Sequence, residues 1–165
     1  MRKYFTVSLT RKLALAGFLV SGFSWAVAEM SVHVIQDLKF GTVTVLRVVP
    51  TGSVSVAPNG TVTTNSPFAM SESQPAIVRV EDKDSQDDPV AGQHIVATFN
   101  PLQVQIASNP NVIVGQYVTD QASNTCITNQ LGQCDFKIGA TISVEDGRNG
   151  SFHAPISILF EESES

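Results

Sequence analysis

The sequence predicts an all-β protein folded as a single antiparallel β-sandwich of about 8–9 strands. Two observations lead to this prediction. Apolar and polar residues alternate with period two over much of the chain, which is typical of strands with one buried face. Turn-forming Gly, Pro and Asn residues recur about every 8–12 residues, and no window of useful length has helical periodicity.

The alternation is longest in the last third of the chain, where two runs flank the Gly-rich segment 145–150. The alternating apolar positions are Phe136, Ile138, Ala140, Ile142 and Val144 in the first run, and Phe152, Ala154, Ile156, Ile158 and Phe160 in the second. This arrangement predicts a long β-hairpin formed by residues 135–144 and 151–160, with one face buried.

The first 28 residues have the organisation of a secretory signal peptide. Arg2 and Lys3 open a basic stretch, an apolar run covers residues 13–23, and Ala26-Val27-Ala28 forms a small-x-small cleavage site. The apolar run is too short for an ordinary transmembrane helix; an uncleaved N-terminal anchor is the alternative. We therefore expect a signal peptide over 1–28, a sandwich domain over 29–160 and an acidic tail over 161–165.

Export would leave a strongly acidic domain. Four of the ten basic residues and none of the fifteen acidic residues lie in 1–28, so six basic residues remain against fifteen acidic ones. Such a chain has no basic surface for phosphates, which argues against nucleic acid as a partner. It also argues against binding to anionic membrane surfaces, and no membrane insertion of the mature chain is expected.

Cys126 and Cys134 are the only cysteines, and both lie in the exported part. An even pair in an oxidising compartment favours a disulfide over a metal site. We expect it to fix the connection that leads into the last hairpin. A redox-active pair would have Cys-x-x-Cys spacing near a helix, and neither feature is present.

The remaining alternating runs predict further strands, and one pair of them predicts a short hairpin. Asn59-Gly60 separates the runs 52–57 and 61–64, and Asn-Gly is a strong hairpin signal because both residues tolerate positive φ. The segment 65–74 is polar and is expected to be a connection. The other expected strands cover residues 29–41, 42–49, 75–81, 92–99, 102–107 and 111–119.

One acidic cluster is the weak candidate for a metal site. Its members are Asp82, Asp84, Asp87 and Asp88. Calcium prefers oxygen ligands from closely spaced carboxylates, but the Gly and the distal Glu of a helical calcium loop are missing. A solvated turn between strands is the favoured interpretation of this segment.

No residue pattern indicates catalysis or a cofactor. The three histidines, His33, His94 and His153, lie far apart and without a neighbouring ligand at metal-binding spacing. There is no Gly-x-Ser-x-Gly elbow and no Gly-rich phosphate loop. We therefore expect a protein that is not an enzyme and that needs no cofactor.

Several short motifs resemble those of an exported bacterial domain-of-unknown-function family with a pilin-like appearance. They are Leu38-Lys39-Phe40-Gly41, the hairpin ending at Asn59-Gly60, the Gly139-containing run 136–144, and Gly150-Ser151-Phe152. The resemblance implies an Ig-like sandwich at the surface of a Gram-negative bacterium, and it brings no catalytic residues. The chain departs from chaperone–usher pilins in its late cysteine pair and its acidic tail.

Two functional interpretations follow. The first is a structural or adhesive subunit of a fimbria-like fibre that assembles by β-strand addition, with 29–40 as the donor segment and Val32, Val34, Leu38 and Phe40 as its groove-filling residues. The same segment would also suit the first strand of its own sandwich. The partners would be other copies, other surface-structure subunits and a periplasmic chaperone. The second interpretation is a monomeric secreted or periplasmic binding module, with or without calcium at the aspartate cluster.

Overall fold

The computed structural model describes residues 29–45, 51–65, 68–100, 103–106, 109–145, 150–151 and 157–163. The predicted signal peptide, residues 1–28, lies outside them, as do residues 46–50 of the expected second strand. The described residues form strands and one three-residue 3₁₀ turn, η1 (Ala122–Asn124). The predicted all-β sandwich is confirmed.

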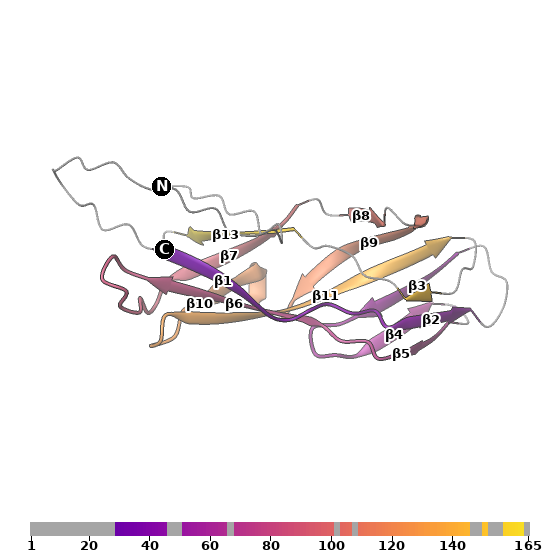
Figure 1. Cartoon of the computed structure of the whole chain (residues 1–165), viewed down its shortest axis with the longest axis horizontal. Coiled ribbons are helices and arrows are strands. Elements are labelled where there is room, and N and C mark those ends of the chain that lie inside the picture. The colour runs from indigo at the N-terminus through magenta and orange to yellow at the C-terminus, as the bar shows by residue number, and fades with distance from the viewer. Residues whose placement is uncertain are drawn as a thin grey trace, which may run out of the picture.

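The strands make one large antiparallel sheet and two small ones. The large sheet contains β1 (Glu29–Gln36), β3 (Thr51–Val56), β4 (Val62–Asn65), β6 (Ala76–Lys83), β8 (Gln103–Ile106), β9 (Asn109–Thr119) and β11 (Gln133–Glu145). One small sheet contains β10 (Thr125–Ile127), β7 (His94–Phe99) and β13 (Ile158–Ser163). The other contains β12 (Gly150–Ser151), β2 (Thr42–Val45) and β5 (Phe68–Ser71). Figure 1 shows the two small sheets towards opposite ends of the molecule.

Strand β11 is the centre of the large sheet. Its first half pairs with β6, and its second half pairs with β3 on one edge and with β9 on the other. Gly139 lies where these pairings meet, and a Cβ atom at this position would come within 2.2 Å of the Val56 carbonyl oxygen. Glycine therefore lets β3 approach this part of β11 closely.

The predicted hairpin of 135–144 with 151–160 is wrong. Strand β11 pairs with β3, β6 and β9, whereas β12 pairs with β2 and β13 pairs with β7. The alternation correctly identified which described residues in these two runs are buried. It does not determine which strand a buried strand pairs with, or in which layer that partner lies. Strand β13 also continues through Glu161 and Glu162 to Ser163, into the segment expected to be a tail.

Two further local expectations differ from the structure. The segment 65–74 contains strand β5, which pairs with β2, so it is not only a connection. The β3–β4 hairpin is confirmed, but within its turn the left-handed conformation falls on Gly60, with φ +83°. Asn59 contributes its side chain instead, because its Oδ1 accepts a hydrogen bond of 2.9 Å from the Thr61 N–H.

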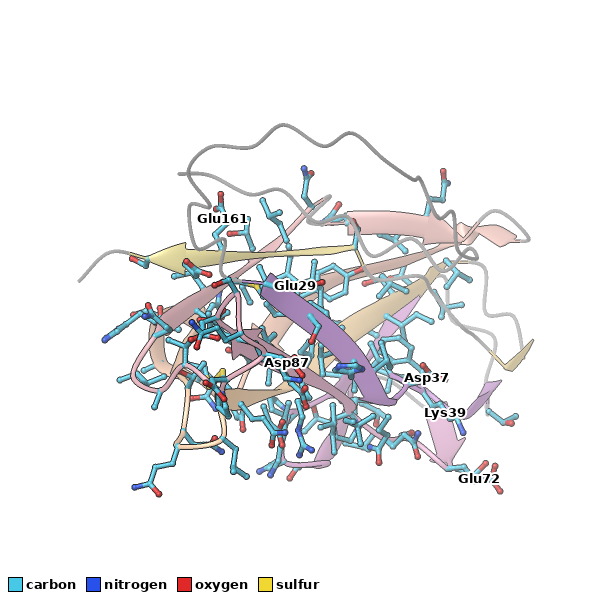
Figure 2. The ribbon with its side chains drawn as sticks, turned by 60° about the vertical axis from the view of Figure 1, so that its left-hand side comes forward. Glu29, Asp37, Lys39, Glu72, Asp87 and Glu161 are labelled. Carbon is cyan, nitrogen blue, oxygen red and sulfur yellow. A yellow bond between two sulfur atoms is a disulfide. The ribbon has the colours of Figure 1, made fainter. Side chains whose placement is uncertain are left out.

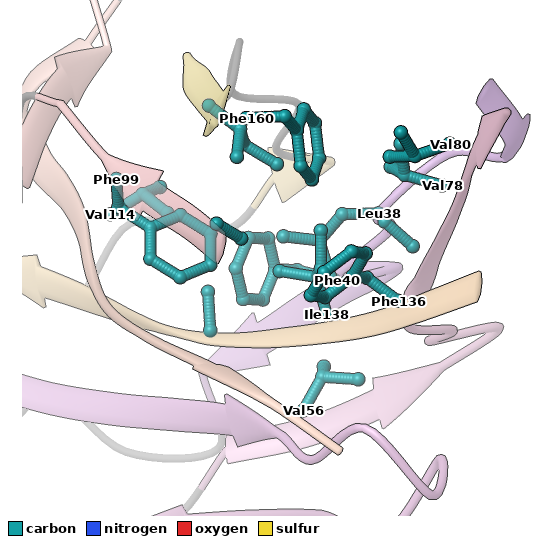
Figure 3. Packing of buried hydrophobic residues seen from close by; sticks show 14 of the residues in the cluster. Leu38, Phe40, Val56, Val78, Val80, Phe99, Val114, Phe136, Ile138 and Phe160 are labelled. Carbon is teal, nitrogen blue, oxygen red and sulfur yellow. The ribbon is translucent and has the colours of Figure 1, made fainter. Parts of the chain in front are cut away.

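The core lies between the large sheet and the sheet of β10, β7 and β13. Figure 3 shows Phe160 of β13 above a group formed by Leu38, Phe40, Phe136 and Ile138. The ring centroids of Phe136 and Phe160 are 5.3 Å apart in a tilted arrangement. Both rings are almost fully buried, so they join the two layers through apolar contact.

Candidate functional site

The N-terminal strand β1 forms an outer edge of the large sheet. Among the described residues its one strand partner is β6, with Ser31 opposite Glu81 and Val32 opposite Val80. In Figure 2, Glu29 and Asp37 mark the two ends of β1, and Lys39 follows beyond Asp37. The backbone groups on the free side of an edge strand can pair with another chain.

The apolar residues of β1 differ widely in burial. Met30 is buried and Val32 packs partly against the core. Val34 is 46% exposed and its neighbour Ile35 is 56% exposed. Two adjacent exposed aliphatic residues on a free edge are a feature that soluble sheets usually avoid.

The four predicted donor residues fall into two groups. Val32 and Val34 lie on β1, whereas Leu38 and Phe40 lie beyond its end and are buried, at 7% and 1% exposure. Sequence reasoning missed Met30, although it has the same parity as Val32 and could have been found from that alternation.

The segment 37–41 is held to the domain by its own set of contacts, and we call it the anchor. Lys39 and Gln74 exchange two backbone hydrogen bonds of 2.9 and 2.8 Å. Gln74 Nε2 donates to the Asp37 carbonyl oxygen at 3.0 Å, and Ser73 Oγ donates to the Phe40 carbonyl oxygen at 2.8 Å.

Gly41 ends the anchor in a conformation that requires glycine. Its φ is +73°, and a Cβ atom there would lie 1.7 Å from the Ser71 carbonyl oxygen. The Leu38-Lys39-Phe40-Gly41 motif therefore has a structural basis: two core side chains alternate with an exposed lysine, and a tight glycine turn follows.

The outer face of β1, β6 and β11 carries polar side chains in rows across the strands. Arg79 of β6 donates two hydrogen bonds to Asp135 of β11, from Nε to Oδ1 at 2.7 Å and from Nη2 to Oδ2 at 2.9 Å. These hydrogen bonds are the main reason why the pKa of Asp135 lies below its ordinary value. His33 of β1 extends this row and lies 3.9 Å from Glu81.

The aspartate cluster is not gathered around one point. Asp82 lies on β6 and is buried, at 1% exposure. Asp84 Oδ1 accepts hydrogen bonds from the Gln86 and Asp88 N–H groups, and Asp87 pairs with Lys83 at 2.8 Å. In the part of the chain that the structure describes, no three His, Cys, Asp or Glu side chains are arranged to hold a metal ion.

The predicted disulfide is present between Cys126 and Cys134. Cys126 lies on β10 and Cys134 on β11, so the bond joins the two layers of the sandwich. The last hairpin, whose connection the bond was expected to fix, is not formed. The loop between the two cysteines packs on the segment that precedes β7: Gln93 N–H donates to Thr128 Oγ1 at 2.9 Å, and this hydroxyl donates to the Val90 carbonyl oxygen at 2.8 Å.

The same loop presents two exposed apolar side chains. Ile127 is 56% exposed and Leu131 is 64% exposed. Gly132 abuts the backbone of Asp82 and Pro89, so this loop and the aspartate cluster lie side by side at one end of the molecule. This end is the second candidate site.

Fold and site together define a disulfide-linked β-sandwich with an exposed N-terminal edge strand. A family model described as a domain of unknown function, DUF4402, matches residues 30–159. The chain therefore belongs to this family, as the resemblance of its motifs to a domain-of-unknown-function family predicts. Neither the curated proteins nor the solved structures include one that the chain matches.

The described part of the chain contains no helix of the length and hydropathy needed to cross a membrane.

Proposed function

We propose that this protein is a non-enzymatic structural or adhesive subunit of a fimbria-like surface structure and that it assembles by β-strand addition. The observation that carries the proposal is β1, an N-terminal edge strand with two adjacent exposed aliphatic residues. Such a strand can leave its own domain without breaking the chain path of any other element. It can then pair with the same acceptor edge in another copy.

The acceptor in this proposal is the edge of β6. Loss of β1 would leave the backbone of residues 77–83 of β6 unpaired on that edge and would uncover Val78 and Val80. The β1 strand of a second copy restores the same hydrogen bonds and the same apolar contacts, so exchange changes the enthalpy little and is favoured by high local concentration. Once β1 has left its own domain, the open β6 edge needs protection until a second copy fills it, which is the expected role of a periplasmic chaperone.

Export to the periplasm or the cell surface accords with the disulfide, because such bonds persist in oxidising compartments. The acidic composition favours solubility there. Other copies of the chain or other subunits of the surface structure are the expected partners.

The experiment that tests the proposal uses material sheared from the surface of the native host. Denaturing gels are run with and without boiling. Strand-complemented fibres give a ladder of subunit multiples that collapses to monomer on boiling. A single monomer band in both lanes would contradict the proposal.

The second candidate function is a monomeric secreted or periplasmic binding module. Ile127 and Leu131 favour it, because a rigid loop held by a disulfide presents them to solvent beside the aspartate cluster. This function predicts the single monomer band. Calcium dependence is checked by adding calcium or a chelator to the mature protein and measuring its melting temperature, which rises with calcium if the aspartates bind it.

A further inference from the structure

We infer that the exchanged segment is β1 alone, that its partner is the β6 edge of a second copy of this chain, and that the anchor 37–41 stays in its own domain. This inference rests on the proposed function and specifies which residues are exchanged. The sequence analysis takes 29–40 as one donor segment, whereas the register shift between Val34 and Gln36 divides this segment at a hinge over residues 35–36.

The feature that defines the hinge is a β-bulge in β1. Val34 pairs with Val78 and Gln36 pairs with Ile77, so Ile35 is an extra residue without a counterpart on β6. A bulge interrupts the ladder locally and bends the strand. The exposure of Ile35 is consistent with this interruption, because its side chain lies outside the core.

Beyond the bulge, the pairing continues only to an isolated bridge. The register that resumes at Gln36–Ile77 runs on to the bridge between Lys39 and Gln74, which places Leu38 opposite Pro75. Because Lys39 and Gln74 exchange both backbone hydrogen bonds, Leu38 and Pro75 form the neighbouring non-hydrogen-bonded pair, and the missing N–H of proline removes no bond here. Gln36 Nε2 donates to the Pro75 carbonyl oxygen at 2.7 Å.

The segments on the two sides of the hinge are held very differently. The anchor has two buried core side chains, the paired backbone bonds of Lys39 with Gln74, and the tight turn at Gly41. Strand β1 has one buried apolar residue, Met30, and one that is partly buried, Val32. Opening at the hinge therefore releases β1 with little loss of core contact, whereas release of the anchor would expose Leu38 and Phe40.

Two engineered disulfides test the inference, each placed across a pair of opposite residues. Ser31→Cys with Glu81→Cys locks β1 to its own β6, and Lys39→Cys with Gln74→Cys locks the anchor. Opposite residues of an antiparallel ladder have Cα separations of about 4.5–5.5 Å, which suits a disulfide. The four single-cysteine variants are the controls, and intact mass confirms that each lock has formed.

Assembly is measured as the heat-sensitive ladder from sheared surface material. The inference predicts that the β1 lock abolishes the ladder and that the anchor lock leaves it at the wild-type level. If both locks abolish it, the whole segment 29–40 is exchanged and the hinge is refuted, while the proposed function stands. If neither lock abolishes it, assembly does not use β1 and the proposed function itself fails.

Hydrogen exchange of the mature monomer gives a second test that does not require the locked variants to fold. Amides of residues 30–34 should exchange at least about tenfold faster than those of Lys39 and Gln74, since the first group opens at the hinge and the second does not. Equal protection on both sides of residues 35–36 would overturn the inference.

Discussion

Among the described strands, the first and the last are both sheet edges, but their apolar residues are buried to different extents. Strand β13 pairs with β7; Ile158 and Phe160 are buried, Leu159 between them is partly exposed, and Glu161 and Glu162 follow in the strand. Strand β1 pairs with β6 and exposes Val34 and Ile35 next to each other. Charge on an edge discourages association, and exposed aliphatic residues favour it. In the proposed assembly, β13 therefore stays with the core and β1 is the strand that exchanges.

The largest expected effect separates the contributions of the two strands to stability. Phe160→Ala removes a buried ring that packs on Phe136, and we expect a loss of about 3–5 kcal/mol in the free energy of unfolding. Val32→Ala on β1 should cost only about 1 kcal/mol, because this side chain is partly buried. Urea denaturation of both variants measures the difference. Equal losses in the free energy of unfolding would contradict the difference between the two strands.

Disrupting the anchor should lower the free energy of unfolding by an amount closer to that for β13 than to that for β1. Gly41→Ala combines a left-handed φ with a Cβ that would collide with the Ser71 carbonyl oxygen, and we expect a loss of about 3 kcal/mol. Gly60→Ala is the matched control, because its φ is also positive but its nearest neighbour is 4.0 Å away. Thermal melts of the two variants isolate the cost of the collision, and similar melting temperatures would contradict it.

The disulfide joins the sheet that contains β1 to the sheet that contains β13. Replacing Cys126 and Cys134 together with serine should lower the free energy of unfolding by about 2.5 kcal/mol, as expected for a loop of this length. Chemical denaturation measures the loss. A wild-type midpoint in the double variant would show that the bond does not constrain the two layers.

The smallest effect concerns the polar row beside β1. Hydrogen bonds from Arg79 lower the pKa of Asp135, so the folded state favours the ionised carboxylate. This contribution to stability is present above the ordinary carboxyl pKa of 3.8 and is lost as the pH falls through the lower pKa of the folded state.

Asp135→Asn should therefore lose a little stability at neutral pH and show a shallower decline in stability below pH ~4. Because both side chains are partly exposed, the change is small. Unfolding midpoints measured from pH 2 to pH 7 check it, and an unchanged acid limb would contradict it.

The sequence could predict which residues face the core but not which strands pair. The alternation in Ala76–Lys83 and Gln133–Glu145 matches their burial, because period two is a direct property of a half-buried strand. The pairing of β13 with β7 depends on how the chain crosses from one sheet to the other, and no local sequence pattern predicts that crossing. Strand β5 was missed for a related reason: its edge pairing with β2 is a tertiary contact.

The candidate site was predictable to a similar degree. Parity placed Val32, Val34, Leu38 and Phe40 on one apolar face, of which Leu38 and Phe40 are buried in their own domain and Val34 is exposed. The cysteine pairing is confirmed. The division between β1 and the anchor was not predictable, because it depends on a bulge at Ile35. The bulge is a property of the pairing between two distant segments.

The most direct test of strand exchange uses two populations of subunits. One carries only Ser31→Cys and the other only Glu81→Cys, and both are exported together by the native host. If β1 pairs with the β6 of another copy, mild oxidation yields mixed disulfide dimers in clear excess over dimers of either single variant. Dimers in random proportions, or monomers alone, would show that β1 stays in its own domain and would contradict the proposed assembly.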